Sequence, residues 1–382
     1  MPKDNIPEIR VRGFSDEWKQ RKLNELIMYQ SSNLTASDAS DIGKYDLYDA
    51  NTIIGKTNIE PIRSEYITVI KDGAGVGRIR VLPPNTMFIG TMGGLQATKS
   101  DLSYIYTLLS RFELGKECSG STIPHIYFKD YGNNEYFVPT IEEQQTIGSY
   151  FAKIDNLITL HQRKYDALVS VKKAMLEKMF PKAGETVPEI RFAGFTDPWE
   201  QRKLGEIGEV ITGSTPSTQH PEYYSEDGMP WVTPTDIVDN IIYDTPRKLS
   251  PIGEKVGRVV PADTILVTCI ASIGKNAMLV NTGSFNQQIN SLVPDKKKYD
   301  PYFLLTESFH WSAKMKREAA AGTMQIVNKN EFSAIETYVP ELSEQKAIGA
   351  YFCQIDKLIT LHQRKCVALK NLKSALLSKM FV

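Results

Sequence analysis

The octapeptide LITLHQRK occurs twice in the chain, at Leu157–Lys164 and again at Leu358–Lys365. Each copy sets a histidine before two basic residues, which could suit a general base, a metal ligand, a DNA contact or a packed core position. The five histidines of the sequence are dispersed and show neither HExxH nor HxH spacing, so they predict no metal site. We expect His161 and His362 to be packed residues.

Two further motifs have more than one interpretation. DGAGVGRIR (Asp72–Arg80) has a Gly-x-Gly-x-Gly spacing, but strand-like residues flank it on both sides, whereas a phosphate loop should open a helix. We expect a glycine-rich turn. CIASIGKNAMLV in the second half is similar, and in both segments a glycine directly precedes a basic residue, Arg78 or Lys275. A basic residue at such a turn could contact a phosphate or a DNA groove. Alternatively, it is an ordinary charged side chain in a surface turn.

Polar loops and basic pairs leave similar alternatives open. TGSTPST, FNQQIN and AGTMQIVNKN are rich in Thr, Asn and Gln, which can pair with base edges but are also common turn formers. The basic pairs that end the two octapeptides lie on a solvated face or contact phosphate or a partner subunit.

Composition restricts the class of protein. The 382 residues include 45 basic and 45 acidic side chains, so bulk charge predicts no nucleic-acid partner and any anion-binding surface must be local. Four scattered cysteines without CxxC spacing indicate reduced thiols. An apolar leader and a membrane-spanning run are absent from the sequence, and we expect a cytoplasmic protein. Walker A, nucleophile-elbow and NPPY or DPPY motifs are also absent, which predicts a chain that is not catalytic by itself.

The chain consists of two similar halves. PEIRVRGFSDEWKQRKL, which begins at Pro7, returns as PEIRFAGFTDPWEQRKL from Pro188. The segment Val138–Phe180 returns as Val339–Phe381, whereas the regions between these repeats share little. Each half therefore has a lead-in, a divergent middle and a closing segment.

The closing segments predict two long helices. Apolar positions recur every 3.5 residues, the spacing of a coiled-coil seam, and a helix of ~40 residues is about 60 Å long. We expect the two helices to pair antiparallel, with the two octapeptide histidines near the crossing. The predicted seam and spacer residues are Ile147, Phe151, Ile154, Ile158, His161, Leu168, Ile348, Phe352, Ile355, Ile359, His362 and Leu369.

Both middles mix short β-rich segments with helical ones. The predicted fold is α+β, with two α/β domains separated by two long helices that form an antiparallel coiled coil, in a pseudo-two-fold repeat. The predicted segments are a lead-in at 1–23, domain 1 at 24–138, helix 1 at 139–181, a repeat lead-in or linker at 182–204, domain 2 at 205–339 and helix 2 at 340–382.

These motifs resemble one family over essentially the whole chain. The lead-ins with QRKL, the two copies of LITLHQRK within EQxxIGxYFxxID…KMF, and the pattern TGSTPS…PWVTPTDI…TILVT…ASIGK…FNQQIN are similar to the DNA-specificity (S) subunit of type I restriction-modification enzymes. The first middle is a more divergent match.

The resemblance implies that each middle is a target-recognition domain for one half of a bipartite site in double-stranded DNA. The helices would space the half-sites and dock two methyltransferase (M) subunits, with two restriction (R) subunits in the full complex. S-adenosylmethionine, ATP and Mg²⁺ would bind those partners, and this chain would bind no cofactor.

The predicted DNA-binding residues follow from this resemblance and from the motifs above. In domain 1 they are Lys71, Arg78, Arg80, Gln96, Thr98 and Lys99, and in domain 2 they are Thr212, Ser214, Thr215, Arg247, Ser272, Lys275, Asn286, Gln287 and Gln325. Two alternatives remain. One is a coiled-coil scaffold without DNA specificity, and the other is a self-contained restriction enzyme, which the absent catalytic motifs disfavour.

Overall fold

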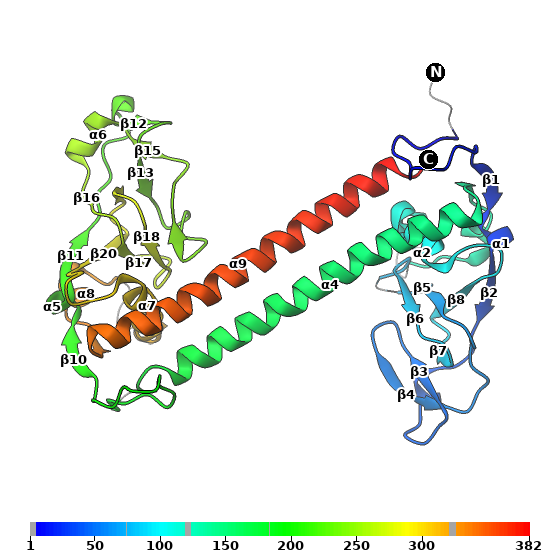
Figure 1. Ribbon diagram of the computed structural model, residues 1–382, viewed down its shortest axis with the longest axis horizontal. Helices are drawn as coiled ribbons and strands as arrows, with labels where there is room; N and C mark the ends of the chain where they lie inside the picture. Colours follow the sequence, from blue (N-terminus) through cyan, green and yellow to red (C-terminus); the bar gives the residue numbers. More distant parts are fainter. Residues whose placement is uncertain (1–4, 74, 119–123, 183, 321–325) are drawn as a thin grey trace. The chain divides into compact units, whose positions relative to one another are not determined.

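The computed structural model describes residues 5–73, 75–118, 124–182, 184–320 and 326–382 (Figure 1). These residues form two compact units. Unit 1 contains the chain up to Arg163 together with His362–Val382, and unit 2 contains Lys164–Leu361. The long helices α4 (Ile141–Lys178) and α9 (Leu342–Lys379) each contribute one part to each unit.

Unit 1 is built on a four-stranded sheet of order β2-β8-β5-β6, with a second sheet of order β4-β3-β7. The β-rich segments SEYITVI, RIRVL and TMFIG of the first middle contain β5, β6 and β7. The strands are β2 (Ile27–Ser31), β3 (Tyr45–Tyr48), β4 (Ile53–Thr57), β5 (Tyr66–Ile70), β6 (Ile79–Leu82), β7 (Thr86–Phe88) and β8 (Met92–Ala97). The helical segments are α1 (Leu23–Leu26), η1 (Ala36–Asp38), α2 (Leu102–Phe112), η2 (Leu114–Glu117) and α3 (Phe128–Tyr131).

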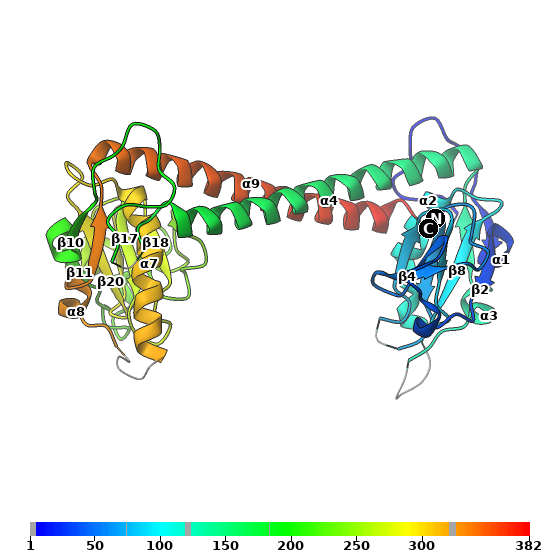
Figure 2. The same ribbon diagram turned by 90° about the horizontal axis from the view of Figure 1, so that it is seen from below.

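Unit 2 has a five-stranded sheet of order β11-β20-β17-β18-β14 and another of order β12-β15-β13-β19-β16. Helix α7 packs on strands β17 and β18 (Figure 2). The strands are β11 (Gly208–Thr212), β12 (Tyr224–Ser225), β13 (Met229–Val232), β14 (Ile241–Ile242), β15 (Lys248–Leu249), β16 (Val259–Val260), β17 (Thr264–Thr268), β18 (Asn276–Leu279), β19 (Gly283–Phe285) and β20 (Ile289–Pro294). The helical segments are α5 (Leu204–Ile207), η3 (Pro221–Tyr223), α6 (Pro251–Val256), α7 (Pro301–Ala320) and α8 (Lys329–Ser333).

In each unit a short two-stranded ribbon joins the mixed α/β domain to a long helix. Strand β1 (Lys19–Lys22) pairs antiparallel with β9 (Glu135–Val138) just before α4 begins. Strand β10 (Glu200–Lys203) pairs in the same way with β21 (Glu336–Val339) before α9. The repeated QRKL motif therefore forms the first strand of both ribbons, which explains why it recurs in otherwise divergent halves.

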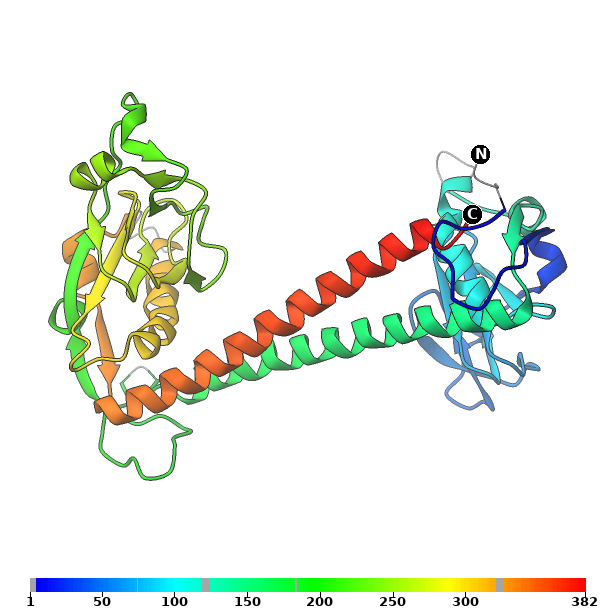
Figure 3. The same cartoon turned by 45° about the horizontal axis from the view of Figure 1, so that its top comes forward.

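Each lead-in is fixed to the long helices by an ion pair with a buried carboxylate. Arg10 donates from Nε and Nη2 to the two carboxylate oxygens of Glu143 at 2.8 and 2.7 Å. Arg191 makes the same contacts with Glu344 in unit 2, at 2.6 and 2.7 Å. The lead-in of unit 1 also lies beside the C-terminal end of α9, where the amide of Ile9 donates to the carbonyl of Lys379 (Figure 3).

The parts of α4 and α9 within each unit run antiparallel. In unit 1, Lys373 Nζ donates to both carboxylate oxygens of Asp155 at 2.6 and 2.8 Å, and His161 lies opposite His362. In unit 2, the repeat-related pair Lys172 and Asp356 is 2.6 Å apart. The predicted fold class, with two repeated mixed domains and two long helices, is confirmed.

The ends of the seam also belong to the domain cores. Ile147 and Phe151 are buried in unit 1 and Ile348 and Phe352 in unit 2, where they belong to the same core clusters as residues of the mixed α/β domains. The final aromatic residues of the two helices pack into the same clusters, Phe381 in unit 1 and Phe180 in unit 2. The other predicted seam residues are buried or half-buried: Ile154, Ile158, His161, Leu168, Ile355, Ile359, His362 and Leu369.

Candidate functional site

The octapeptide histidines contact each other. His161 Nδ1 and His362 Nδ1 are 2.8 Å apart, and the ring centroids are separated by 5.0 Å. Both rings are half-buried. At this distance one nitrogen donates a proton and the other accepts it, so the pair forms a hydrogen bond across the two helices. Among the described residues, no group of three or more His, Cys, Asp or Glu side chains could hold a metal ion.

In unit 2, strand register brings most of the predicted DNA-binding residues to one end of the main sheet. Thr212 at the end of β11 pairs with Asn290 near the start of β20, and Thr268 at the end of β17 pairs with Ile289. The loops that leave β11 and β17 and the segment that enters β20 therefore meet at this end. We call the predicted residues gathered there the polar edge: Thr212, Ser214, Thr215, Ser272, Lys275, Asn286 and Gln287.

Hydrogen bonds hold the polar edge in place. Thr212 Oγ1 donates to Asn290 Oδ1 at 2.6 Å, and Thr215 bonds to Gln287. Lys275 Nζ donates to the carbonyl of Pro234 at 3.0 Å. Thr215, Ser272, Lys275 and Gln287 are exposed, so polar groups remain accessible at a site whose backbone is fixed.

Arg258 forms hydrogen bonds with residues of the polar edge, and the sequence prediction did not include it. Its Nη1 donates to the carbonyl of Thr212 at 2.7 Å, and its amide donates to Ser214 Oγ at 3.1 Å. Since Arg258 is 46 residues from Thr212, no local motif signals this contact. The predicted residue Gln325 lies outside the described residues.

In unit 1, only some of the predicted DNA-binding residues lie close to one another. Lys71 follows β5 and Arg78 precedes β6, at the sheet end that corresponds to the polar edge. Arg78 Nη2 donates to Ala50 O and Asn51 Oδ1, at 2.8 and 2.7 Å. Arg80 Nη1 donates to Asn51 O at 2.9 Å.

The other three predicted residues of unit 1 lie elsewhere. Gln96 and Thr98 are at the C-terminal end of β8, where Thr98 Oγ1 donates to Leu26 O at 3.3 Å, and Lys99 follows. Strand β8 begins at the Arg78 end of the sheet and carries these residues to the opposite end, so the structure does not bring them together with Arg78. The direction of a strand is not readable from its composition, so the sequence could not show this separation.

The glycine-rich stretch forms the loop between antiparallel β5 and β6. The amide of Gly77 donates to the carbonyl of Ile70 at 2.9 Å, and Gly77 has φ +80°. Gly274 occupies the corresponding position in unit 2 with φ +81°. The expectation of a turn is confirmed, and the stretch does not open a helix.

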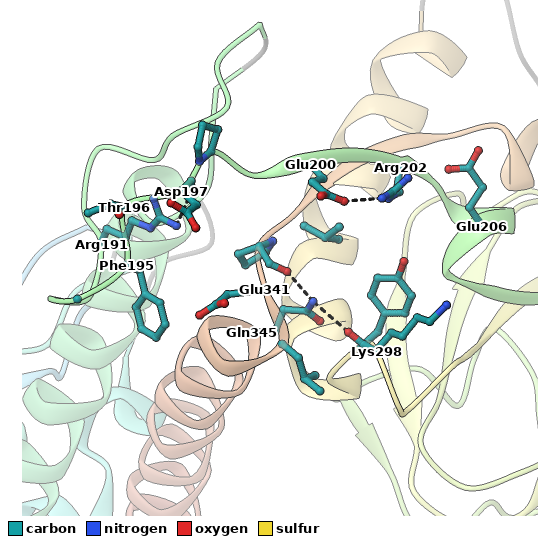
Figure 4. A pocket seen from close by; sticks show the side chains of 16 residues that line it. Arg191, Phe195, Thr196, Asp197, Glu200, Arg202, Glu206, Lys298, Glu341 and Gln345 are labelled. Carbon is teal, nitrogen blue, oxygen red and sulfur yellow. Dashed lines mark hydrogen bonds and ion pairs between the residues drawn. The ribbon is translucent and has the colours of Figure 1, made fainter.

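Each unit also has a polar pocket between its lead-in, its ribbon and the first turn of a long helix. In unit 2 it measures about 720 Å³ (Figure 4). Arg202 pairs there with Glu200, and Arg191 with Glu344. The unit 1 pocket of about 600 Å³ includes Lys99. Because both arginines in the unit 2 pocket have acidic partners, the polar edge is the better candidate for an anion.

The comparisons with known families decide which ligand fits these features. A family model described as the type I restriction modification DNA specificity domain matches the chain twice, over residues 15–169 and 196–371. The chain belongs to this family. The predicted main role, sequence-specific DNA recognition without catalysis by the chain itself, is confirmed over the scaffold alternative. None of the described helices is long and apolar enough to span a membrane.

Relatives and one solved structure agree with this assignment. The MjaVIII specificity subunit of Methanocaldococcus jannaschii is 22% identical over 98% of this chain and 94% of its own length. The HindI specificity subunit of Haemophilus influenzae is 32% identical, but the match spans 37% of this chain and only 32% of that relative. The S subunit of M. genitalium shares the fold, with a TM-score of 0.74 at 17% identity over 99% of both chains.

Proposed function

We propose that the two units of this DNA specificity subunit each read one half of a bipartite site in double-stranded DNA. The observation that carries the proposal is the polar edge of unit 2, where exposed Thr, Ser, Lys and Gln side chains converge from three separate loops. Hydroxyl and amide groups bond base edges, and lysine bonds phosphate. The corresponding sheet end of unit 1 has a different set, including Arg78 and Lys71, as expected of a domain that reads another sequence.

In this proposal the long helices space the half-sites and dock two methyltransferase subunits. Each unit exposes two leucines of the octapeptide, Leu157 and Leu160 in unit 1 and Leu358 and Leu361 in unit 2, at 44 to 45% exposure. Identical exposed leucines in both halves favour a partner that is present twice. The adjacent basic pairs Arg163–Lys164 and Arg364–Lys365 are also exposed and would border that contact.

The chemistry would belong to the partners. Methyltransferase subunits would supply S-adenosylmethionine, and two restriction subunits would supply ATP and Mg²⁺, so this chain needs no cofactor of its own. The relatives come from a bacterium and an archaeon, whose DNA lies in the cytoplasm, and we place the complex there.

A DNA-shift assay with and without an adenine methyltransferase partner tests the main claim. We expect sequence preference that depends on the partner, and binding without any preference would support the scaffold alternative instead.

Lys275→Ala in the assembled complex tests the polar edge. Loss of a phosphate contact should weaken all DNA sequences alike and reduce the slope of log K against log salt by about 0.9. Lys296→Ala is the matched control, because Lys296 follows β20 at the opposite end of the sheet and pairs with Asp263. Unchanged affinity and salt slope in Lys275→Ala would contradict the assignment.

A further inference from the structure

Arg247 in unit 2 lies against two aromatic rings. Its guanidinium carbon is 5.2 Å from the ring centroid of Tyr224 and 5.9 Å from that of Trp231. The two rings meet edge to face, with centroids 5.9 Å apart and planes at 72°. A guanidinium in contact with two rings keeps less freedom than one on an open surface, so its position is largely set before any ligand binds.

The two rings are themselves fixed by the loop that follows β11. Trp231 Nε1 donates to the carbonyl of Ser214 at 3.1 Å, and Tyr224 Oη donates to the carbonyl of Pro216 at 2.6 Å. Trp231 is buried. Since Ser214 belongs to the polar edge, these bonds set the position of Arg247 relative to that edge.

The donors of Arg247 are not used within the chain. Arg247 is exposed, and in the part of the chain that the structure describes its guanidinium has no hydrogen-bond or ion-pair partner. Its neighbours differ, because Arg258 donates to the carbonyl of Thr212 and Lys248 pairs with Asp244 at 2.9 Å. Arg247 thus combines a positioned planar group with free N–H donors.

We propose that Arg247 reads a guanine through a bidentate hydrogen bond to O6 and N7 in the major groove. This inference rests on the proposed function, since it requires that unit 2 face DNA with its polar edge. Guanine is the base whose major-groove edge presents two adjacent acceptors, and a fixed guanidinium fork matches that edge. A guanidinium fork also pairs with phosphate, but a phosphate contact carries no sequence information, so the loss of preference at a single base distinguishes the two.

The test measures sequence preference in the complex of the full chain with its methyltransferase partner, using selection from a randomised DNA pool. Arg247→Ala should lose preference for guanine at one position of one half-site, by roughly ten- to a hundred-fold. The other positions should keep their preference. Arg247→Lys should lose the same preference while it keeps the salt dependence of binding, because lysine retains the charge but not the fork.

Lys248→Gln is the matched control, since it removes a neighbouring positive charge that is already paired with Asp244. It should leave guanine preference unchanged. Tyr224→Phe keeps the ring but removes the bond to Pro216 O, and it should weaken the guanine preference partially.

Two results would overturn the inference. One is a specific wild-type complex whose preference at every position survives Arg247→Ala. The other is uniform weakening in Arg247→Ala with full recovery in Arg247→Lys, which would identify a phosphate contact. A wild-type complex with no sequence preference would instead refute the proposed function. Circular dichroism melting of each variant confirms that the compared chains are folded.

Discussion

Gly77 illustrates how single residues position the proposed DNA-facing loops. A Cβ atom at Gly77 would lie 2.1 Å from the amide nitrogen of Gly115, and the residue has φ +80°. Gly73 in the same loop has φ +85° but no atom within 4 Å of its Cβ position. A side chain at either position is strained by the backbone, at roughly 1–2 kcal/mol, but only at Gly77 must the neighbouring backbone also move.

We therefore predict that Gly77→Ala lowers the free energy of unfolding by more than the ~1 kcal/mol expected for Gly73→Ala. Urea denaturation of the full chain measures both. If both variants lost the same free energy of unfolding, the close approach of Gly77 to Gly115 would not affect stability in solution.

His310 gives unit 2 a pH-dependent contribution to stability. Its Nδ1 is 2.9 Å from Glu307 Oε2. Burial lowers the pKa of His310, but the charge of Glu307, its hydrogen bond and a hydrogen bond to the backbone of Leu176 together outweigh this, so the net pKa is raised. A group whose pKa is raised by folding stabilises fully below its unfolded pKa, and this stabilisation is lost as pH rises through the folded pKa.

His310→Gln should therefore reduce the free energy of unfolding more at about pH 5.5 than at about pH 8, on either side of the ordinary histidine range. The difference between wild type and variant in urea denaturation at the two pH values is the measurement. A loss that does not change with pH would mean that the ion pair contributes nothing.

At the scale of elements, polar pairs fix the register of the helices. Asp155 and Lys373 are partly buried and bond through both carboxylate oxygens, and Lys172 and Asp356 form the repeat-related pair. An apolar seam alone permits neighbouring registers, whereas a misaligned pair leaves buried charges without partners.

We predict that Lys373→Glu destabilises the chain by roughly 1–3 kcal/mol, since the pair lies between exposed and fully buried cases. Exchange of the two charges, Asp155→Lys with Lys373→Glu, should restore much of this loss. A double-mutant cycle by thermal unfolding tests the coupling, and additive effects would show that the two side chains do not interact.

The helices were predictable because their signal is long and regular. Phe151 and Phe352 fall in the same heptad register, and both are buried. The polar edge was predictable in part because TGSTPST and FNQQIN flank strands that pair directly. The packing of Arg247 against two aromatic rings was not predictable from the sequence. Tyr224 and Trp231 lie in separate strands and come together only in the sheet that contains β12, β15 and β13. The separation of Gln96 from Arg78 was not predictable, because composition does not give strand direction.

At the scale of the whole molecule, the two units share repeated structural parts but differ in the loops at their proposed DNA-facing sheet ends. The lead-in ion pairs of Arg10 and Arg191, the ribbons and the octapeptides recur in both units. The loops at the proposed DNA-facing sheet ends do not. This division is what the proposed bipartite reader requires, because the repeated parts would face common partners while each sheet end would meet its own half-site.

Mapping of methylated adenines in DNA modified by the full chain with its methyltransferase partner tests this account most directly. It predicts a motif of two specified blocks separated by unspecified bases. Arg247→Ala in unit 2 should relax the block that unit 2 reads and leave the other block unchanged, whereas Lys275→Ala should leave the sequence of both blocks unchanged. A single continuous motif, or variants of unit 2 that relax both blocks equally, would contradict it.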